Sequence, residues 1–304
     1  MPSGHRPRGR QPSLVMPVLL LAALAAAAML FVLVLLWPRT PLQQVPQVER
    51  HAAMAPAYED FERLPTSEEP EPATSPTPSA ADHGLALIID DIGYDKHALK
   101  RLLALNVPMA ISVLPDAPLA RETADLAYEA GQTVMLHLPM EPENRALSRR
   151  MSTAFLRATM DQAELRKTFL ADLSKVPHVI GVNNHMGSLL TQMDAPMQWV
   201  MDLCRKHGLF FVDSRTHKDS VAAKMARDAG IAWASRRYFL DHRLDRASML
   251  HVWKQATHCA RSERCILIAH PHALTLDFLE DVLGREHDIP IVRVTRLLHE
   301  RGAS

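Results

Sequence analysis

The chain has few cysteines and no excess charge of either sign. Only three cysteines occur among its 304 residues, which excludes a disulfide framework and a cysteine-rich zinc module. Lysine plus arginine and aspartate plus glutamate both number 34, so no chain-wide basic field exists to hold a nucleic acid. Nucleic acid is therefore excluded as a partner, and a metal site in this chain must use histidine and carboxylate ligands.

Histidine, in contrast, is frequent, with 16 copies. Imidazole is the commonest side-chain metal ligand and titrates near neutral pH, so this count favours metal binding or acid–base chemistry. The length and the hydrophobic content of 47% are sufficient for one sizeable domain with additional segments.

The N-terminal part carries a basic cluster followed by a long apolar run. After three arginines in the first ten residues, the 24 residues at 14–37 contain no charge, and a helix of this length crosses a hydrocarbon core of about 30 Å. A cleaved signal peptide is the alternative, but its apolar region usually has about 7 to 15 residues, and this run stays bulky up to Trp37. We expect a cytoplasmic basic tail at 1–13 and a transmembrane signal anchor at 14–37.

The charge distribution around this run predicts its orientation. Basic residues precede it and an acidic segment follows, so the N-terminus is expected in the cytoplasm and the protein in the inner (cytoplasmic) membrane as a single-pass protein. Residues 38–82 are rich in Pro, Glu, Ser and Thr and predict a disordered linker, because they bury too little apolar surface to offset the entropy of ordering. The domain at 83–304 is then expected in the periplasm or extracytoplasmic space.

From residue 84 onward, short apolar runs alternate with helical patterns. Eight such runs predict buried strands, at 85–89, 109–114, 133–136, 179–182, 210–212, 231–234, 265–269 and 291–294. Helical patterns separate them, at 97–105, 120–130, 162–176, 197–207, 218–229, 249–260 and 276–283. This alternation predicts an α/β fold with a parallel sheet that is open or closed into a barrel.

Side chains that bind metals or move protons follow several of the predicted strands. Asp90 and Asp91 end the first strand, whereas His137, His185 and His270 follow later ones. In parallel α/β folds the loops after the strands converge on the ligand site, so these side chains are expected close together. The Asp pair has an alternative role as a cap of the next helix, and a lone histidine at such a position is usually a hydrogen-bonded structural residue.

Five motifs in order resemble the divergent polysaccharide deacetylase family, a branch of the NodB-like carbohydrate esterases. They are Ile-Ile-Asp-Asp at 88–91, Leu-His-Leu-Pro-Met-Glu-Pro at 136–142, Asn-Asn-His-Met-Gly-Ser at 183–188, Phe-Val-Asp-Ser-Arg-Thr at 211–216 and Ala-His-Pro-His at 269–272. The resemblance covers essentially residues 84–300. It implies a distorted (β/α)7-type barrel and hydrolysis of C–N bonds other than peptide bonds.

The resemblance also implies roles for individual residues. The first Asp of the pair acts as general base in that superfamily and the second binds a divalent metal, usually zinc, so Asp90 is the expected base and Asp91 a ligand. His137 corresponds to another metal ligand, and His270 resembles the late-motif histidine that acts as general acid.

One departure from the superfamily pattern concerns the third ligand. Typical members carry two histidines four residues apart in the second motif, whereas the residue four after His137 is Glu141. We expect His185 as the third ligand because imidazole binds zinc well, with Glu141 as the competitor. Asp213 is left with three possible roles, which are orienting His270, binding substrate and capping a turn.

The resemblance implies removal of acetyl groups from an envelope or extracellular polysaccharide, with the acetylated glycan as substrate, and the expected anchor makes the membrane the second partner. The alternative is a deacetylase-like domain that binds glycan or protein without turnover.

Three further features are expected to matter less. Cys259 and Cys265 can form a disulfide in an oxidising compartment, and Cys204 is expected as a buried thiol. The basic residues at 145–157 are either a solvated face or a contact for an anionic glycan.

Overall fold

The computed structural model describes residues 83–284 and 288–300. The expected basic tail at 1–13, membrane anchor at 14–37 and linker at 38–82 lie outside these ranges. Within the described ranges, none of the helices combines the length and the hydropathy that a membrane span requires.

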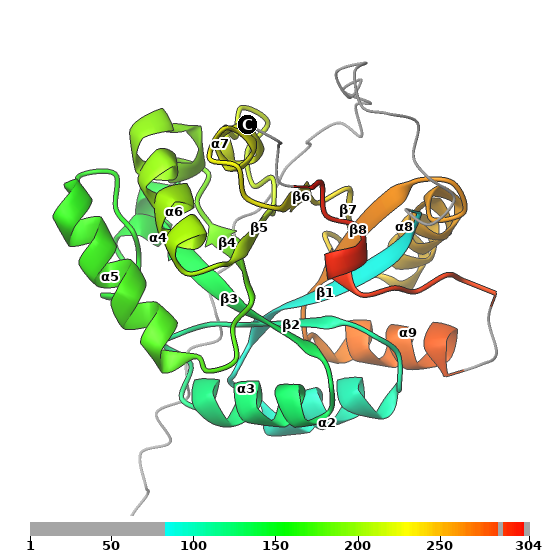
Figure 1. Ribbon diagram of the computed structural model, residues 1–304. Helices are drawn as coiled ribbons and strands as arrows, with labels where there is room; N and C mark the ends of the chain where they lie inside the picture. The colour runs from blue at the N-terminus through cyan, green and yellow to red at the C-terminus, as the bar shows by residue number, and fades with distance from the viewer. Residues whose placement is uncertain (1–82, 285–287, 301–304) are drawn as a thin grey trace, which may run out of the picture. The chain divides into compact units, whose positions relative to one another are not determined.

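The domain is built around one curved parallel sheet (Figure 1). Its strands are β1 (Gly84–Ile92), β2 (Ala110–Val113), β3 (Thr133–Met140), β4 (Gly181–Met186), β5 (Phe210–Asp213), β6 (Trp233–Ser235), β7 (Tyr238–Phe239) and β8 (Arg264–Ala269). Their spatial order is β6-β5-β4-β3-β2-β1-β8-β7, and every neighbouring pair is parallel. The predicted parallel α/β architecture is therefore confirmed.

The two edge strands, β6 and β7, are consecutive in the chain and are separated only by Arg236 and Arg237. The Arg236 N–H donates to the Asp213 carbonyl in β5 (2.9 Å), and the Arg237 N–H donates to the Ile266 carbonyl in β8 (2.9 Å). The segment at 233–239 thus pairs with one edge of the sheet and then with the other. The sheet is curled toward a barrel of seven strands, if β6 and β7 are counted as one.

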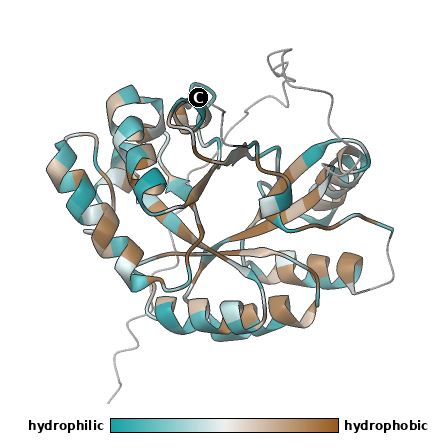
Figure 2. Ribbon diagram, viewed as in Figure 1, coloured by the Kyte–Doolittle hydropathy of each residue, from teal (hydrophilic) through white to brown (hydrophobic). Residues whose placement is uncertain are grey.

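Helices cover the outer face of the sheet (Figure 1). They are α2 (Lys96–Ala104), α3 (Ala120–Glu129), α5 (Gln162–Lys175), α6 (Asp194–Lys206), α7 (Ala222–Asp228), α8 (Arg246–Cys259) and α9 (Ala273–Leu283). The short helix α4 (Arg145–Ser148) buries none of its residues, and the 3-10 turns are η1 (Leu190–Gln192) and η2 (Val294–Arg296). Apolar side chains of the strands and of the inward helix faces form the main core, and the strands are mainly brown in the hydropathy view (Figure 2). Short polar caps start several helices, such as the capping box of Asp161 and Glu164 before α5.

The inner face of the sheet changes character along the strands. Near the start of the strands it is apolar and forms a second, smaller core with η2, which includes Ile88, Met135, Val212 and Ile268. Because side chains alternate along a strand, the residues two positions further on, Asp90, His137, Ser214 and His270, follow on the same face. The apolar end thus supports a polar cluster at the C-terminal end.

Two local expectations differ from the structure. The run at 291–294 contributes one isolated bridge, Leu85 with Ile291, because β8 and β2 already occupy both sides of β1 from Ile88 onward. The two-residue strand β7 is too short to predict from a hydrophobic pattern. Cys259 and Cys265, whose pairing the sequence leaves open, form a disulfide that joins the end of α8 to β8, and Cys204 is a buried free thiol as expected.

Candidate active site

The first strand delivers two adjacent carboxylates to the same polar cluster. Asp90 and Asp91 are both buried, and Asp91 has a positive φ of 57°. This left-handed backbone, which Asp tolerates better than most residues, turns the chain so that both side chains can face the cluster. The helix-cap alternative does not hold, because Asp95 caps α2 by accepting from the His97 N–H (2.7 Å).

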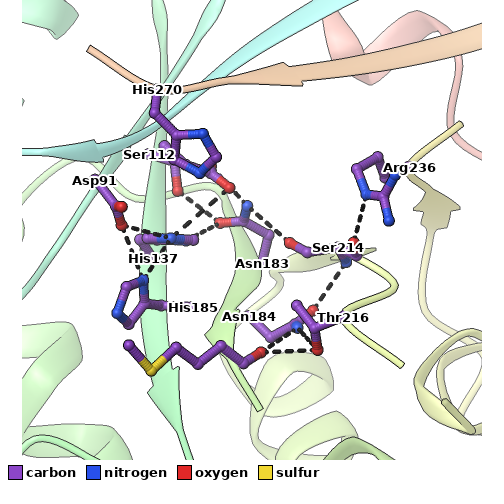
Figure 3. A network of polar contacts seen from close by, with 12 residues as sticks. Asp91, Ser112, His137, Asn183, Asn184, His185, Ser214, Thr216, Arg236 and His270 are labelled. Carbon is purple, nitrogen blue, oxygen red and sulfur yellow. Dashed lines mark hydrogen bonds and ion pairs between the residues drawn. The ribbon is translucent and has the colours of Figure 1, made fainter. Parts of the chain in front are cut away.

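The imidazoles of His137 and His185 come from neighbouring strands and meet at Asp91 (Figure 3). His137 Nε2 lies 3.1 Å and His185 Nδ1 lies 2.9 Å from Asp91 Oδ1. The two nitrogens are 3.2 Å apart. All three side chains are at least nine-tenths buried, so the three atoms form a compact group shielded from water.

The geometry of this group fits a metal ion better than a set of hydrogen bonds. Both carboxylate oxygens of Asp91 are buried and neither accepts an aligned hydrogen bond, although two ring nitrogens lie within ion-pair distance. A buried carboxylate without such a bond is costly unless a cation satisfies it. One oxygen and two imidazole nitrogens that converge in this way are a ligand set that divalent metals such as zinc accept.

The charges in the group influence each other strongly. Burial would raise the pKa of Asp91, but the imidazoles of His185 and His137 hold it well below its usual value. Burial would lower the pKa of His137, but the carboxylates of Asp90 and Asp91 raise it above its usual value. The site therefore concentrates negative charge that favours a nearby cation.

Asn183 connects Asp90 to His137. Its Oδ1 lies 3.0 Å from His137 Nδ1 and accepts from Ser112 Oγ (2.6 Å), and its Nδ2 donates to Asp90 Oδ1 (2.8 Å). Because the amide oxygen can only accept, His137 Nδ1 must carry the proton, which leaves the Nε2 lone pair directed at Asp91 and His185. Nδ2 also lies 3.3 Å from Ser214 Oγ, a contact that is drawn as a dashed line in Figure 3.

His270 follows β8 and is held by Asp241. Asp241 Oδ1 lies 3.0 Å from His270 Nδ1, and Oδ2 accepts from the His270 N–H (2.7 Å) and from Thr275 Oγ1 (2.9 Å). Burial would lower the pKa of His270, but the Asp241 carboxylate raises it to about 9. The Phe239 ring stacks on the imidazole at 5.4 Å between centroids. His270 is therefore held in place and charged at neutral pH.

The other sequence candidates lie in different surroundings. Glu141 Oε2 accepts from the Ala158 N–H (2.7 Å) and is not part of the Asp91 group. Asp213 accepts from the Arg215 N–H (2.8 Å) and from Ser220 Oγ (2.9 Å), which is the turn-capping arrangement among its three possible roles.

A second group of metal-ligand types is formed by Asp241, His270 and His272. Both carboxylate oxygens of Asp241 already accept hydrogen bonds, in contrast to those of Asp91. The Asp91 group is therefore the better candidate for a metal centre among the described residues.

Sequence reasoning assigned no role to Asn183 and missed Asp241. Asn183 lies two residues before His185, and this spacing places both on the same face of β4, so alternation could have indicated its position. Asp241 follows β7, whose two residues give no pattern. Its contact with His270 spans 29 residues of sequence.

Comparison with known proteins agrees with this fold and shows the family. A family model for divergent polysaccharide deacetylases matches residues 87–298, and the chain therefore belongs to this family. It is similar to the uncharacterized protein YibQ of Escherichia coli (34% identical, covering 71% of this chain and 67% of YibQ). It is also similar to an uncharacterized protein of Haemophilus influenzae (32% identical, 72% and 78%).

Among solved structures, the uncharacterized protein ATU2773 from Agrobacterium tumefaciens has a similar fold. The TM-score is 0.64 at 19% identity, and the alignment covers 73% of this chain and 92% of that protein. At this identity the similarity shows the fold.

Proposed function

We propose that this protein is a metal-dependent hydrolase that removes acetyl groups from a polysaccharide of the cell envelope. The proposal rests on the convergence of Asp91, His137 and His185 at the C-terminal end of the sheet in a domain of the deacetylase family. A second carboxylate, that of Asp90, lies beside them. This arrangement pairs a site for a cation with a separate base, as hydrolysis of an amide or ester requires.

Asp91, His137 and His185 would hold the ion, with zinc as the expected metal because of the imidazole-rich ligand set. With a divalent ion bound, these three side chains would place it where it could polarise a substrate carbonyl and make water a better nucleophile at neutral pH.

Two residues of the chain supply the proton transfers. Asp90 takes the proton of the attacking water, and the amide of Asn183 holds its carboxylate in place through Oδ1. His270 gives a proton to the departing amine from Nε2, since Asp241 occupies Nδ1. Its raised pKa, about 9, keeps it protonated for this step at neutral pH.

The compartment is part of the proposal. The disulfide between Cys259 and Cys265 supports an oxidising environment outside the cytoplasm, because thiols stay reduced in the cytosol. The uncharged run at 14–37, outside the described residues, supports attachment to the inner membrane.

Acetate release from an N-acetylglucosamine oligomer tests the function, with metal content measured on the same samples. The zinc-loaded chain should release acetate. Asp90→Asn and His270→Ala should keep the metal and lower turnover by roughly 100- to 10,000-fold, the usual contribution of a general acid or base. Asp228→Asn, on the exposed surface of α7, is the control that should keep full activity.

Two results would contradict the proposal. Full activity in Asp90→Asn or His270→Ala would remove that residue from the mechanism. A chain that retains metal and binds acetylated oligomers but releases no acetate from any of them would be a binding domain without turnover.

A further inference from the structure

The segment at 144–160 concentrates positive charge in a chain whose net charge is zero. It contains four arginines, Arg145, Arg149, Arg150 and Arg157, and no aspartate or glutamate. We call these four side chains the arginine rim. A local excess of one sign acts at short range, because physiological salt screens exposed charges beyond about 8 Å.

Backbone contacts fasten this segment to the end of β3, close to the metal ligands. The Leu156 N–H donates to the Pro139 carbonyl (2.8 Å), and the Glu141 N–H donates to the Leu156 carbonyl (2.9 Å). The neighbouring Phe155 ring lies edge-on to the His185 imidazole, with 5.9 Å between centroids. The arginine rim therefore belongs to a segment that borders the candidate metal centre.

The arginines of the rim have no acidic partner among the described residues. Arg149 Nε donates to the Arg145 carbonyl (3.3 Å) and Arg157 Nη2 contacts the Met151 carbonyl (3.5 Å), both of which are backbone groups. Several other exposed arginines form ion pairs with carboxylates, as Arg246 does with Asp281. The guanidinium groups of the rim are thus available to anions from outside the chain.

We infer that the arginine rim binds acidic groups of the glycan, so that the substrate is an anionic acetylated polysaccharide that carries carboxylates or phosphates. The inference rests on the proposed function, which makes the bound glycan a substrate. Guanidinium groups form paired hydrogen bonds with carboxylate and phosphate oxygens, which a neutral sugar does not offer. A glycan is favoured over a lipid surface because the Phe155 ring of the same segment lies against His185, which places the segment beside the site where the glycan would react.

Calorimetric binding to the full chain tests the inference without relying on turnover. The neutral probe is an N-acetylglucosamine tetramer and the carboxylate probe is a hyaluronan tetrasaccharide, which alternates N-acetylglucosamine with glucuronate. N-acetylglucosamine 6-phosphate, compared with N-acetylglucosamine, separates phosphate from carboxylate recognition. At about 0.05 M salt the anionic probe should bind roughly tenfold more tightly than the neutral one, and this advantage should shrink at about 0.5 M salt.

The double variant Arg149→Gln/Arg150→Gln should lose roughly fivefold in affinity for the anionic probe and keep its affinity for the neutral one. The matched control is Arg166→Gln/Lys167→Gln, an exposed basic pair on α5, which should change neither. Equal binding of both probes, or equal loss in the two double variants, would overturn the inference.

Two further outcomes separate this inference from the proposed function. In the first, both probes bind equally, and the rim variants release acetate from neutral oligomers as fast as the original chain. This result would support the deacetylase activity and contradict anion binding by the rim. Rim-dependent binding to vesicles of anionic lipid, without preference for the anionic sugar, would reassign the rim to a membrane surface.

Discussion

At the scale of single residues, Asn183 links two of the expected functional side chains. Its amide contacts the expected base, Asp90, and the expected ligand, His137, and it is completely buried. A hydrogen bond to the far nitrogen of a metal-binding imidazole sets its tautomer and its orientation. One amide therefore positions both the expected ligand and the expected base.

Asn183→Ala should weaken metal affinity by roughly 10- to 100-fold and lower kcat more than it changes KM. The matched control is Asn184→Ala. Asn184 is equally buried, but its amide contacts the Met186 carbonyl, Thr216 and the Ser214 N–H. Both variants should lose thermal stability, and only Asn183→Ala should lose metal affinity. Equal metal affinity in the two variants would reduce Asn183 to a structural role.

The identity of the third ligand is tested by metal content. Asp91→Ala, His137→Ala and His185→Ala should each lose most of the bound metal, because a three-ligand site loses its geometry with any one of them. Glu141→Ala should retain it, since the Glu141 carboxylate accepts from the Ala158 N–H. Loss of metal in Glu141→Ala with retention in His185→Ala would show that the ligand assignment is wrong.

The pH dependence of turnover tests the pairing of His270 with Asp241. In the proposed mechanism the protonated imidazole is the active form, so activity should persist to about pH 9 and fall as the pH rises through the pKa of His270. Asp241→Asn removes the largest charge that raises this pKa, while burial still lowers it and Asp90 and Asp91 still raise it. The alkaline limit should then move to a lower pH. An unchanged profile would show that His270 does not act as the acid.

At the scale of elements, β4 depends on a residue without a side chain. Gly181 begins β4 on the inner face, and a Cβ added there would lie 2.1 Å from the Phe210 ring of β5. The ring fills the space beside Gly181, and Asn183 follows two residues further along on the same face of the strand. Packing at the start of β4 therefore supports the polar groups at its end.

Gly181→Ala should destabilise the domain by about 1–3 kcal/mol, because an added methyl group in a packed core forces its neighbours to shift. Urea unfolding measures the change. The double variant Gly181→Ala/Phe210→Leu should recover part of it by making room. A Gly181→Ala domain as stable as the original would mean that the ring moves without cost.

At the scale of the whole molecule, the N-terminal run and the envelope location are linked. If residues 14–37 anchor the chain, the full protein should remain in the membrane fraction, with its C-terminal domain accessible to protease from the outer side. Cell fractionation and N-terminal sequencing decide this. A soluble mature chain that starts near residue 38 would identify the run as a cleaved signal peptide.

The sequence by itself determined the parallel α/β class, the family and the residues at the strand ends. These features depend on local periodicity and short motifs, such as Ile88 to Asp91, which are readable without knowing the partner strands. His185 was also preferred over Glu141 on ligand chemistry, and the structure brings His185 to Asp91.

Only the tertiary structure decided which polar groups meet. Asn183 reaches Asp90 across 93 residues and Asp241 reaches His270 across 29, and both contacts depend on strand order and register. The side-chain alternation of a strand tells which face a residue occupies and not which neighbour it faces. For the same reason the sequence does not show that the chain passes from one edge of the sheet to the other through Arg236 and Arg237. The two residues between β6 and β7 carry no pattern of their own.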